Sequence, residues 1–198
     1  MEDSLSRRAW LRSLASGAIE AAGDAVRTRV DRRFPARRRP PGAEPESAFL
    51  ALCTRCGACA EACHHDSIHA FDDQSGLLAG TPVLLPDRRA CHQCEGFPCA
   101  AACEEPALEV PTTATWRLGR VRLDPDRCIA FAGPECGACV GVCPDGAPAL
   151  SLVSWRPELD AEVCVGCGLC IERCPTRPKA LVLAPLAAHD QQLPLEQE

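Results

Sequence analysis

Sixteen cysteines dominate the chemistry that this 198-residue sequence could perform. Cysteine thiolates bind zinc and iron–sulfur clusters, and oxidised cysteine pairs form disulfides. The cysteines fall into four groups of four, and three residues always separate the last two members of a group. These groups, numbered quartets 1 to 4, are Cys53, Cys56, Cys59 and Cys63; Cys91, Cys94, Cys99 and Cys103; Cys128, Cys136, Cys139 and Cys143; and Cys164, Cys167, Cys170 and Cys174.

The spacing within the quartets favours [4Fe–4S] clusters. Quartets 1 and 4 have the pattern C-x2-C-x2-C-x3-C, while quartets 2 and 3 read C-x2-C-x4-C-x3-C and C-x7-C-x2-C-x3-C. Three closely spaced thiolates can surround one face of a cubane cluster and leave one iron for a ligand from elsewhere in the chain. Pro175 completes the bacterial ferredoxin run in quartet 4. We therefore predict four [4Fe–4S] clusters, with all sixteen cysteines as ligands.

Zinc and disulfides are the two alternative uses of these cysteines. Structural zinc favours two C-x2-C pairs set about a dozen or more residues apart, without the third cysteine that every quartet here contains. A disulfide scaffold belongs to secreted proteins and would need an export signal. His64, His65 and His92 stand beside cysteines and could replace a missing ligand. Since no cysteine is missing, we interpret these histidines as surface residues or neighbours of the ligands.

Short elements must position the quartets. Extended runs precede quartets 2, 3 and 4, and a brief apolar segment follows each quartet, which is the pattern of small hairpins. The C-x3-C spacing fits one helical turn, and alanines around it favour helix. The runs are 81–87, 119–124 and 154–160, and the apolar segments are 67–68, 107–108, 149–153 and 180–183. We predict an α+β fold with two bacterial-ferredoxin-like units, each for two clusters, in one compact domain with an N-terminal helical arm.

Composition indicates a small domain with a thin apolar core. Hydrophobic residues make up 46% of the chain, but this figure includes the cysteines, and there are only five Phe, three Trp and no Tyr. Cross-links by metal or disulfide must then supply part of the stability. Residues 1–42 carry a net charge of +5 and residues 43–198 carry −11. The acidic body argues against a nucleic-acid partner, and no apolar run is long enough for a direct membrane span.

Three segments follow from these patterns: a basic amphipathic arm and linker over 1–45, a four-cluster domain over 46–183, and a flexible tail over 184–198. Ser6-Arg7-Arg8 is close to a twin-arginine export signal. The next residues lack a run of Leu or Val and include acids, while apolar residues recur with helical spacing. We therefore expect an arm that is retained in the cytoplasm, with export to the periplasm as the alternative.

No catalytic motif accompanies the cysteines. The sequence has no dinucleotide-binding glycine turn after a strand, no phosphate-binding P-loop, and no catalytic triad or paired carboxylates that stand out. An enzyme-like use would need a cluster with an open iron, and sixteen cysteines for four clusters leave none open. We expect an electron-transfer or accessory protein rather than an enzyme, with a maturation or assembly partner as the alternative.

The sequence resembles the ferredoxin-type accessory proteins of periplasmic nitrate reductase and methylamine-oxidation systems, the NapF, NapG and MauM types. The resemblance covers roughly residues 46–183. It rests on Phe49-Leu-Ala-Leu-Cys-Thr-Arg-Cys-Gly-Ala-Cys59, on Gly80-Thr-Pro82 leading to Cys91-His-Gln-Cys-Glu-Gly-Phe-Pro-Cys99, and on Cys128-Ile-Ala-Phe-Ala-Gly-Pro-Glu-Cys136.

The resemblance implies a redox partner. Proteins of the NapF type are cytoplasmic and associate with a molybdenum catalytic subunit before its export. Proteins of the NapG and MauM types are exported and pass electrons from quinol. The implied partner is therefore the catalytic subunit of a redox enzyme, a molybdenum-containing and nitrate-reductase-like one, or a quinol-oxidising membrane protein. The acidic body would suit docking on a basic patch.

Quartet 2 also resembles that of the four-cluster subunits of molybdenum oxidoreductases, in which quartets pair in nested fashion. Carried over to this sequence, quartet 1 would pair with quartet 4 and quartet 2 with quartet 3, and sequential pairing is the alternative. The nested ligand sets would be Cys53, Cys56, Cys59 and Cys174; Cys164, Cys167, Cys170 and Cys63; Cys91, Cys94, Cys99 and Cys143; and Cys128, Cys136, Cys139 and Cys103.

Overall fold

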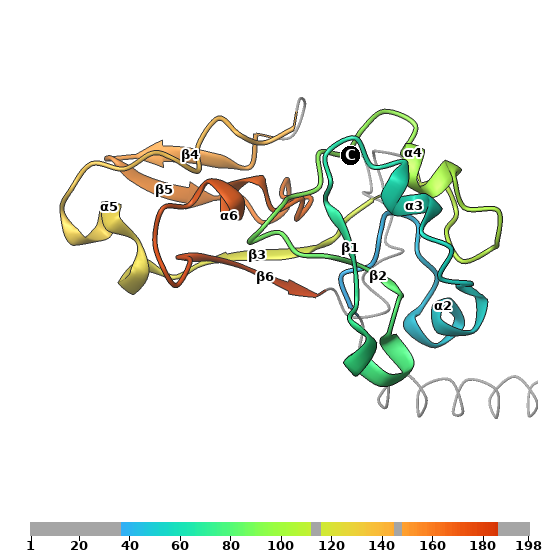
Figure 1. Ribbon diagram of the computed structural model, residues 1–198. Helices are drawn as coiled ribbons and strands as arrows, with labels where there is room; N and C mark the ends of the chain where they lie inside the picture. Colours follow the sequence, from blue (N-terminus) through green and yellow to red (C-terminus); the bar gives the residue numbers. More distant parts are fainter. Residues whose placement is uncertain (1–36, 112–115, 145–147, 186–198) are drawn as a thin grey trace, which may run out of the picture. The chain divides into compact units, whose positions relative to one another are not determined.

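A computed structural model describes residues 37–111, 116–144 and 148–185 of the chain (Figure 1). All of these belong to a unit that begins at Ala36. The amphipathic arm and most of the tail predicted from the sequence lie outside the described residues and stay predictions. Helices and strands are both present, which confirms the predicted mixture of α and β structure.

The first half of the described chain holds quartets 1 and 2. Its inner hairpin joins the two quartets through antiparallel pairing of Ile68 with Leu84. An outer contact, the bridge of Ala43 with Leu108, joins the segment before quartet 1 to the segment after quartet 2. The elements are α2 (Glu46–Leu52), α3 (Ala58–Glu61), β1 (Ile68–Ala70), η1 (Asp73–Leu78), β2 (Pro82–Leu84) and α4 (Pro98–Ala101).

The second half repeats this order around quartets 3 and 4. Strands β4 and β5 form the inner hairpin between the two quartets, and β3 pairs with β6 as the outer antiparallel pair. The outer pair is a full ladder here, whereas the predicted run 107–108 of the first half forms only a single bridge. The elements are β3 (Gly119–Leu123), η2 (Pro125–Arg127), α5 (Ile129–Ala132), β4 (Leu150–Val153), β5 (Arg156–Leu159), α6 (Leu169–Arg173) and β6 (Leu181–Pro185).

Hydrogen bonds tie the two halves together at quartets 2 and 4. The N–H of Cys91 donates to the carbonyl of Cys167 at 3.0 Å. The carboxylate of Glu172 accepts from the N–H of Ala90 at 2.7 Å. The loops of quartets 2 and 4 therefore lie against each other.

A buried arginine holds the segment that precedes α2. Both oxygens of the Glu46 carboxylate accept from Arg39, at 2.7 Å from Nη2 and 3.0 Å from Nε. The remaining nitrogen, Nη1, donates to Thr81 Oγ1 at 2.9 Å and to the carbonyl of Pro82 at 2.6 Å. The guanidinium also stacks 4.6 Å from the centre of the Phe49 ring. The sequence predicts that this arginine lies in a linker. Its guanidinium nitrogens instead bind groups within the domain, so Arg39 is part of the domain.

Removal of the Glu46 carboxylate is expected to lower the free energy of unfolding of the domain. Only 4% of the Arg39 side chain and 3% of the Glu46 side chain are exposed, so Glu46→Ala would leave a buried charge without its counterion at a cost of about 3–5 kcal/mol. Anaerobic denaturant titration measures this loss.

The exposed pair of Arg127 with Asp124 provides the control. Its nitrogen and oxygen are 3.0 Å apart, but the side chains are 49% and 35% exposed, so Arg127→Ala should cost no more than about 1 kcal/mol. Equal losses in the two variants would contradict a structural role for the buried pair.

Candidate metal centres

The structure gathers the sixteen cysteines into four sets, each drawn from two consecutive quartets. Three cysteines of one quartet share a set with the fourth cysteine of its neighbour. Sets 1, 2 and 4 line three separate hollows. The sets are Cys53, Cys56, Cys59 and Cys103 (set 1); Cys91, Cys94, Cys99 and Cys63 (set 2); Cys128, Cys136, Cys139 and Cys174 (set 3); and Cys164, Cys167, Cys170 and Cys143 (set 4).

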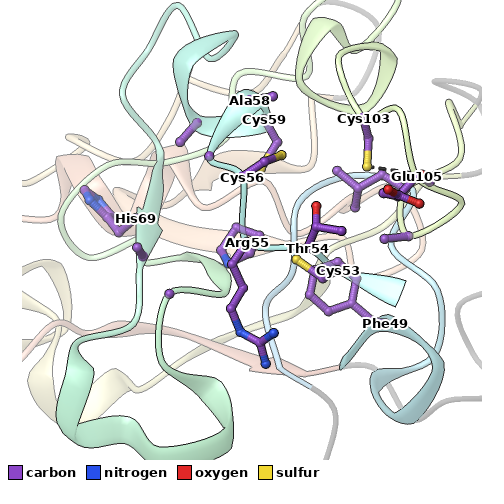
Figure 2. Close-up of a pocket in the computed structure, with 17 residues that line it drawn as sticks. Phe49, Cys53, Thr54, Arg55, Cys56, Ala58, Cys59, His69, Cys103 and Glu105 are labelled. Atoms are coloured by element: carbon purple, nitrogen blue, oxygen red, sulfur yellow. Dashed lines mark hydrogen bonds between the residues drawn. The ribbon is translucent and has the colours of Figure 1, made fainter. Parts of the chain in front are cut away.

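Set 1 illustrates the arrangement. Figure 2 shows Cys53 and Cys56 on the segment that leads into α3, Cys59 in the first turn of α3, and Cys103 on the separate segment that faces them. His69 lines the same hollow, and its buried Nε2 has no hydrogen-bond partner in the protein. A buried nitrogen without a partner is costly. In Figure 2 the His69 ring points away from Cys53, Cys56 and Cys59, so this nitrogen does not identify a ligand in the hollow.

Left-handed backbone shapes the loop before three of the short helices. Positive φ occurs at Gly57 (83°), Phe97 (44°) and Gly168 (89°), each of which directly precedes a helix. The third cysteine of quartets 1, 2 and 4 is then the second residue of α3, α4 and α6 respectively. Such turns direct backbone N–H groups to one side, as in the concave anion sites of many iron–sulfur proteins.

Quartet 3 departs from this pattern. Its seven-residue insertion contains α5 instead of a C-x2-C loop, and residues 138–141 form a turn rather than a helix. The third cysteine of this quartet, Cys139, is nevertheless buried like its counterparts. The insertion therefore changes the route of the backbone but keeps the thiol inside.

Burial makes the thiols costly to ionise. It raises the pKa of Cys59, Cys99, Cys139 and Cys167 to about 11 and that of Cys91 to about 12, and neighbouring thiols of the same set add to the rise. Backbone N–H groups act in the opposite direction at each of these sulfurs. Because the thiolate is the metal ligand, iron would have to offset this cost. Four soft sulfur donors around a mostly apolar hollow fit a [4Fe–4S] cluster.

Cys174 is the exception among the buried thiols. Burial acts to raise its pKa, but hydrogen bonds from the side chain and backbone of Thr176 and from the backbone of Ala180 and Leu181 together outweigh burial and lower it. The Thr176 hydroxyl lies 3.2 Å from the sulfur, and Lys179 Nζ donates to the Cys174 carbonyl at 2.5 Å. Thr176 and His69 were not identified from the sequence, because a single polar residue beside a cysteine carries no spacing signal.

The histidines beside the cysteines lie at the edge of set 2. The rings of His65 and His92 stack with centroids 3.6 Å apart, and both residues line the hollow of this set. Burial, and then the neighbouring His65, lowers the pKa of His92. His64 is exposed. The hollow already has four thiols, which supports the interpretation of these residues as neighbours of the ligands.

The nested pairing of quartets predicted from the resemblance is wrong, because each set of four cysteines comes from consecutive quartets. Quartet 1 meets quartet 2, and quartet 3 meets quartet 4, because the inner hairpins β1–β2 and β4–β5 fold consecutive quartets onto each other. All sixteen cysteines are free thiols in the structure. Within the described ranges, no three His, Cys, Asp or Glu side chains converge as they would around a single metal ion.

Comparisons with known proteins identify cluster-binding segments. A model of the 4Fe-4S dicluster domain matches residues 120–175, which span quartets 3 and 4. A 4Fe-4S binding domain matches residues 50–69, which contain quartet 1.

No helix in the described part of the chain has the length and apolar character to cross a bilayer.

Several curated proteins are similar over most of the chain. The ferredoxin-type protein NapG of Escherichia coli (strain K12) is 34% identical over 91% of this chain and 86% of its own length. The methylamine utilization ferredoxin-type protein MauM of Paracoccus denitrificans (strain Pd 1222) is 35% identical over 69% of this chain and 66% of its own length. The ferredoxin-type protein NapF of Escherichia coli (strain K12) is 34% identical over 76% of this chain and 87% of its own length.

Gly166→Ala is expected to destabilise the protein more than Gly57→Ala. Both glycines have positive φ, so a Cβ costs about 1–2 kcal/mol at either position. At Gly166 the Cβ would also overlap the Gly119 carbonyl on β3, which adds about 1–3 kcal/mol, whereas Gly57 faces open space. Anaerobic thermal unfolding compares the two variants. Equal midpoints would contradict the close packing of the quartet 4 loop on β3.

Proposed function

The chain belongs to the family of ferredoxin-type proteins that includes NapG, MauM and NapF, and on that premise we propose that it transfers single electrons through four [4Fe–4S] clusters. The sixteen cysteines would hold these clusters as sets 1 to 4. When bound, each cluster would accept and release one electron. The observation that carries the proposal is the meeting of four thiols from two separate quartets in each of the hollows of sets 1, 2 and 4.

We further propose that the two halves are two bacterial-ferredoxin-like units with two clusters each. The match of the dicluster domain to residues 120–175 supports this for the second half. The first half supports it by its element order, since both halves place an inner hairpin between two quartets and close the unit with an outer antiparallel contact.

The contact between the halves suggests how the sets follow one another. Cys91 belongs to set 2 and Cys167 to set 4, and the hydrogen bond between their backbones brings these two sets together. Sets 1 and 2 share quartets 1 and 2, and sets 3 and 4 share quartets 3 and 4. The proposed order is therefore set 1, set 2, set 4, set 3, with sets 1 and 3 at the two ends.

The proposed partner is a redox enzyme, and the protein itself is not a catalyst. The names of its relatives describe ferredoxin-type proteins, one of them from methylamine utilization. We propose as partner a catalytic subunit, a molybdenum-containing and nitrate-reductase-like one, or a quinol-oxidising membrane protein. The cytoplasmic location expected from the N-terminal arm stays a prediction, with the periplasm as the alternative.

Protein purified without oxygen is expected to contain about sixteen iron atoms and as many acid-labile sulfides per chain, four of each per cluster. Dithionite reduction should then give EPR signals broadened by coupling between neighbouring clusters. About eight iron atoms, or zinc in their place, would contradict the four-cluster proposal. A full complement of iron that no redox enzyme can reduce or oxidise would instead favour a maturation or assembly role.

Paired cysteine variants test the ligand sets. Cys56→Ala with Cys103→Ala removes two ligands of set 1, so the double variant should lose about four iron atoms, no more than either single variant. Cys56→Ala with Cys63→Ala removes ligands of two sets from a single quartet, so it should lose about eight. Iron analysis of the anaerobic proteins measures both. A loss of only four in the second pair would show that each quartet holds its own cluster.

A further inference from the structure

An apolar ridge, formed by Val153 and Trp155, lies at the tip of the hairpin β4–β5. Trp155 is 67% exposed and Val153 47%, and Leu152, which strand alternation places on the opposite face of β4, is 39% exposed. These are three of the seven large hydrophobic side chains that are exposed among the described residues. Exposed apolar side chains that cluster on a soluble protein mark interaction sites far more often than isolated ones do.

The backbone at the tip of this hairpin is unfavourable for the residues that occupy it. Val153 pairs with Arg156, so Ser154 and Trp155 form a two-residue turn, and both have positive φ, at 49° and 65°. Such turns favour Asn-Gly, because left-handed backbone is costly for a large side chain. Strain of this kind concentrates at functional sites. The sequence keeps a tryptophan at a position where a glycine would be more stable.

The hairpin that carries the ridge packs on the loop of quartet 3. Gly137 lies between Cys136 and Cys139 in the sequence. A Cβ atom on this glycine would be 3.2 Å from Leu152 Cδ1. The guanidinium of Arg156 stacks on the ring of Phe131 in α5, with 5.2 Å between guanidinium carbon and ring centroid. These contacts fix the hairpin to the loop that supplies most of set 3. A molecule seated on the ridge would therefore lie next to this end of the proposed series of sets.

The charges around the ridge are mixed, with Arg156 paired with Val153 and two carboxylates nearby, so that acidic groups are in excess. Glu158 pairs with Ser151 across the hairpin and, by the alternation of strands, lies on the same face as Val153. Glu158 and Glu135, which directly precedes Cys136, are both exposed. Residues 43–198 also carry the net charge of −11. Charge complementarity therefore favours a partner with basic side chains around its contact surface.

We propose that this ridge is the docking surface for a protein redox partner that presents an apolar recess bordered by basic side chains. The inference rests on the electron-transfer function proposed above and adds the place at which electrons leave or enter. Trp155 would be the anchor, since tryptophan is enriched among the few residues that dominate binding energy. A small contact of this kind suits transient redox encounters.

Two other occupants fit the charges less well. A second copy of this chain would place like-charged carboxylates against each other, and the surface of an anionic membrane would repel them. Both are distinguishable outcomes of the experiment below.

Stopped-flow mixing with cytochrome c, a small basic haem protein, tests the proposal on the full-length, anaerobically purified protein. One electron leaves the dithionite-reduced protein and converts ferric haem to ferrous, and no atom is transferred. We expect Ser154→Asn with Trp155→Gly to lower the second-order rate constant at least tenfold. In a variant with Glu135→Gln and Glu158→Gln, the second-order rate constant should fall less steeply as salt is added.

Three controls separate docking from damage. Leu77→Ser alters an equally prominent side chain, 70% exposed on η1, and should leave the cytochrome c rate unchanged. Tris-bipyridine cobalt(III), a small oxidant that needs no docking ridge, should react at the same rate with wild-type protein and with the Ser154→Asn, Trp155→Gly variant. The melting temperature of the Asn-Gly variant should stay the same or rise, because the new turn suits the backbone.

Each of the following results would overturn the inference. An unchanged cytochrome c rate in the Ser154→Asn, Trp155→Gly variant would show that the ridge is not the docking surface. A lower melting temperature of this variant would show that Trp155 stabilises the fold by packing. Sedimentation with vesicles of phosphatidylcholine and phosphatidylserine by wild-type protein but not by the Ser154→Asn, Trp155→Gly variant, or dimerisation through Trp155, would assign the ridge to another occupant. Failure of wild-type protein to reduce either oxidant would overturn the electron-transfer proposal itself.

Discussion

Four thiols that share a buried hollow cannot all ionise unless a positive group joins them, and most features of this protein follow from that constraint. Burial raises the pKa of thiols such as Cys59 and Cys91 to about 11 and 12, so the sulfurs alone would remain protonated at neutral pH. Iron would supply the compensating charge, and backbone N–H groups supply a smaller share. The apolar core then needs few large side chains; Phe49, Phe97, Leu84 and Leu181 are the largest that are fully buried.

The constraint reaches the rest of the fold through short, irregular backbone. Helices of four or five residues such as α3, α4 and α6 cannot be stable alone, and the left-handed residues before them are costly. Close packing on other segments holds these loops in place, as where Gly166 lies against Gly119 of the same half and Gly168 against Pro86 of the other half. Quartet 3 shows that one such loop can be replaced, because α5 takes its place while Cys139 stays buried.

Sequence reasoning identified the cysteines and the α+β class because both depend on local patterns of residue type and spacing. The pairing of quartets depends on which segments meet after folding. The hairpins β1–β2 and β4–β5 decide that, and no cysteine spacing reports it. Arg39 was assigned to a linker because a run of arginines and prolines usually lies in solvent, and only Glu46 and Thr81, from separate segments, reveal its burial. The sequence places Trp155 in an extended run. The alternation of side chains along a strand does not predict its exposure, because Trp155 lies in the turn of the hairpin.

Diffraction at the iron absorption edge, from crystals of the protein grown without oxygen, tests the central claim most directly. The account predicts four separate iron groups, one bonded by each of sets 1 to 4, so that Cys103 binds the same group as Cys53, Cys56 and Cys59. Fewer iron groups, or a group at these three cysteines that is completed by Cys63 or Cys174, would contradict it.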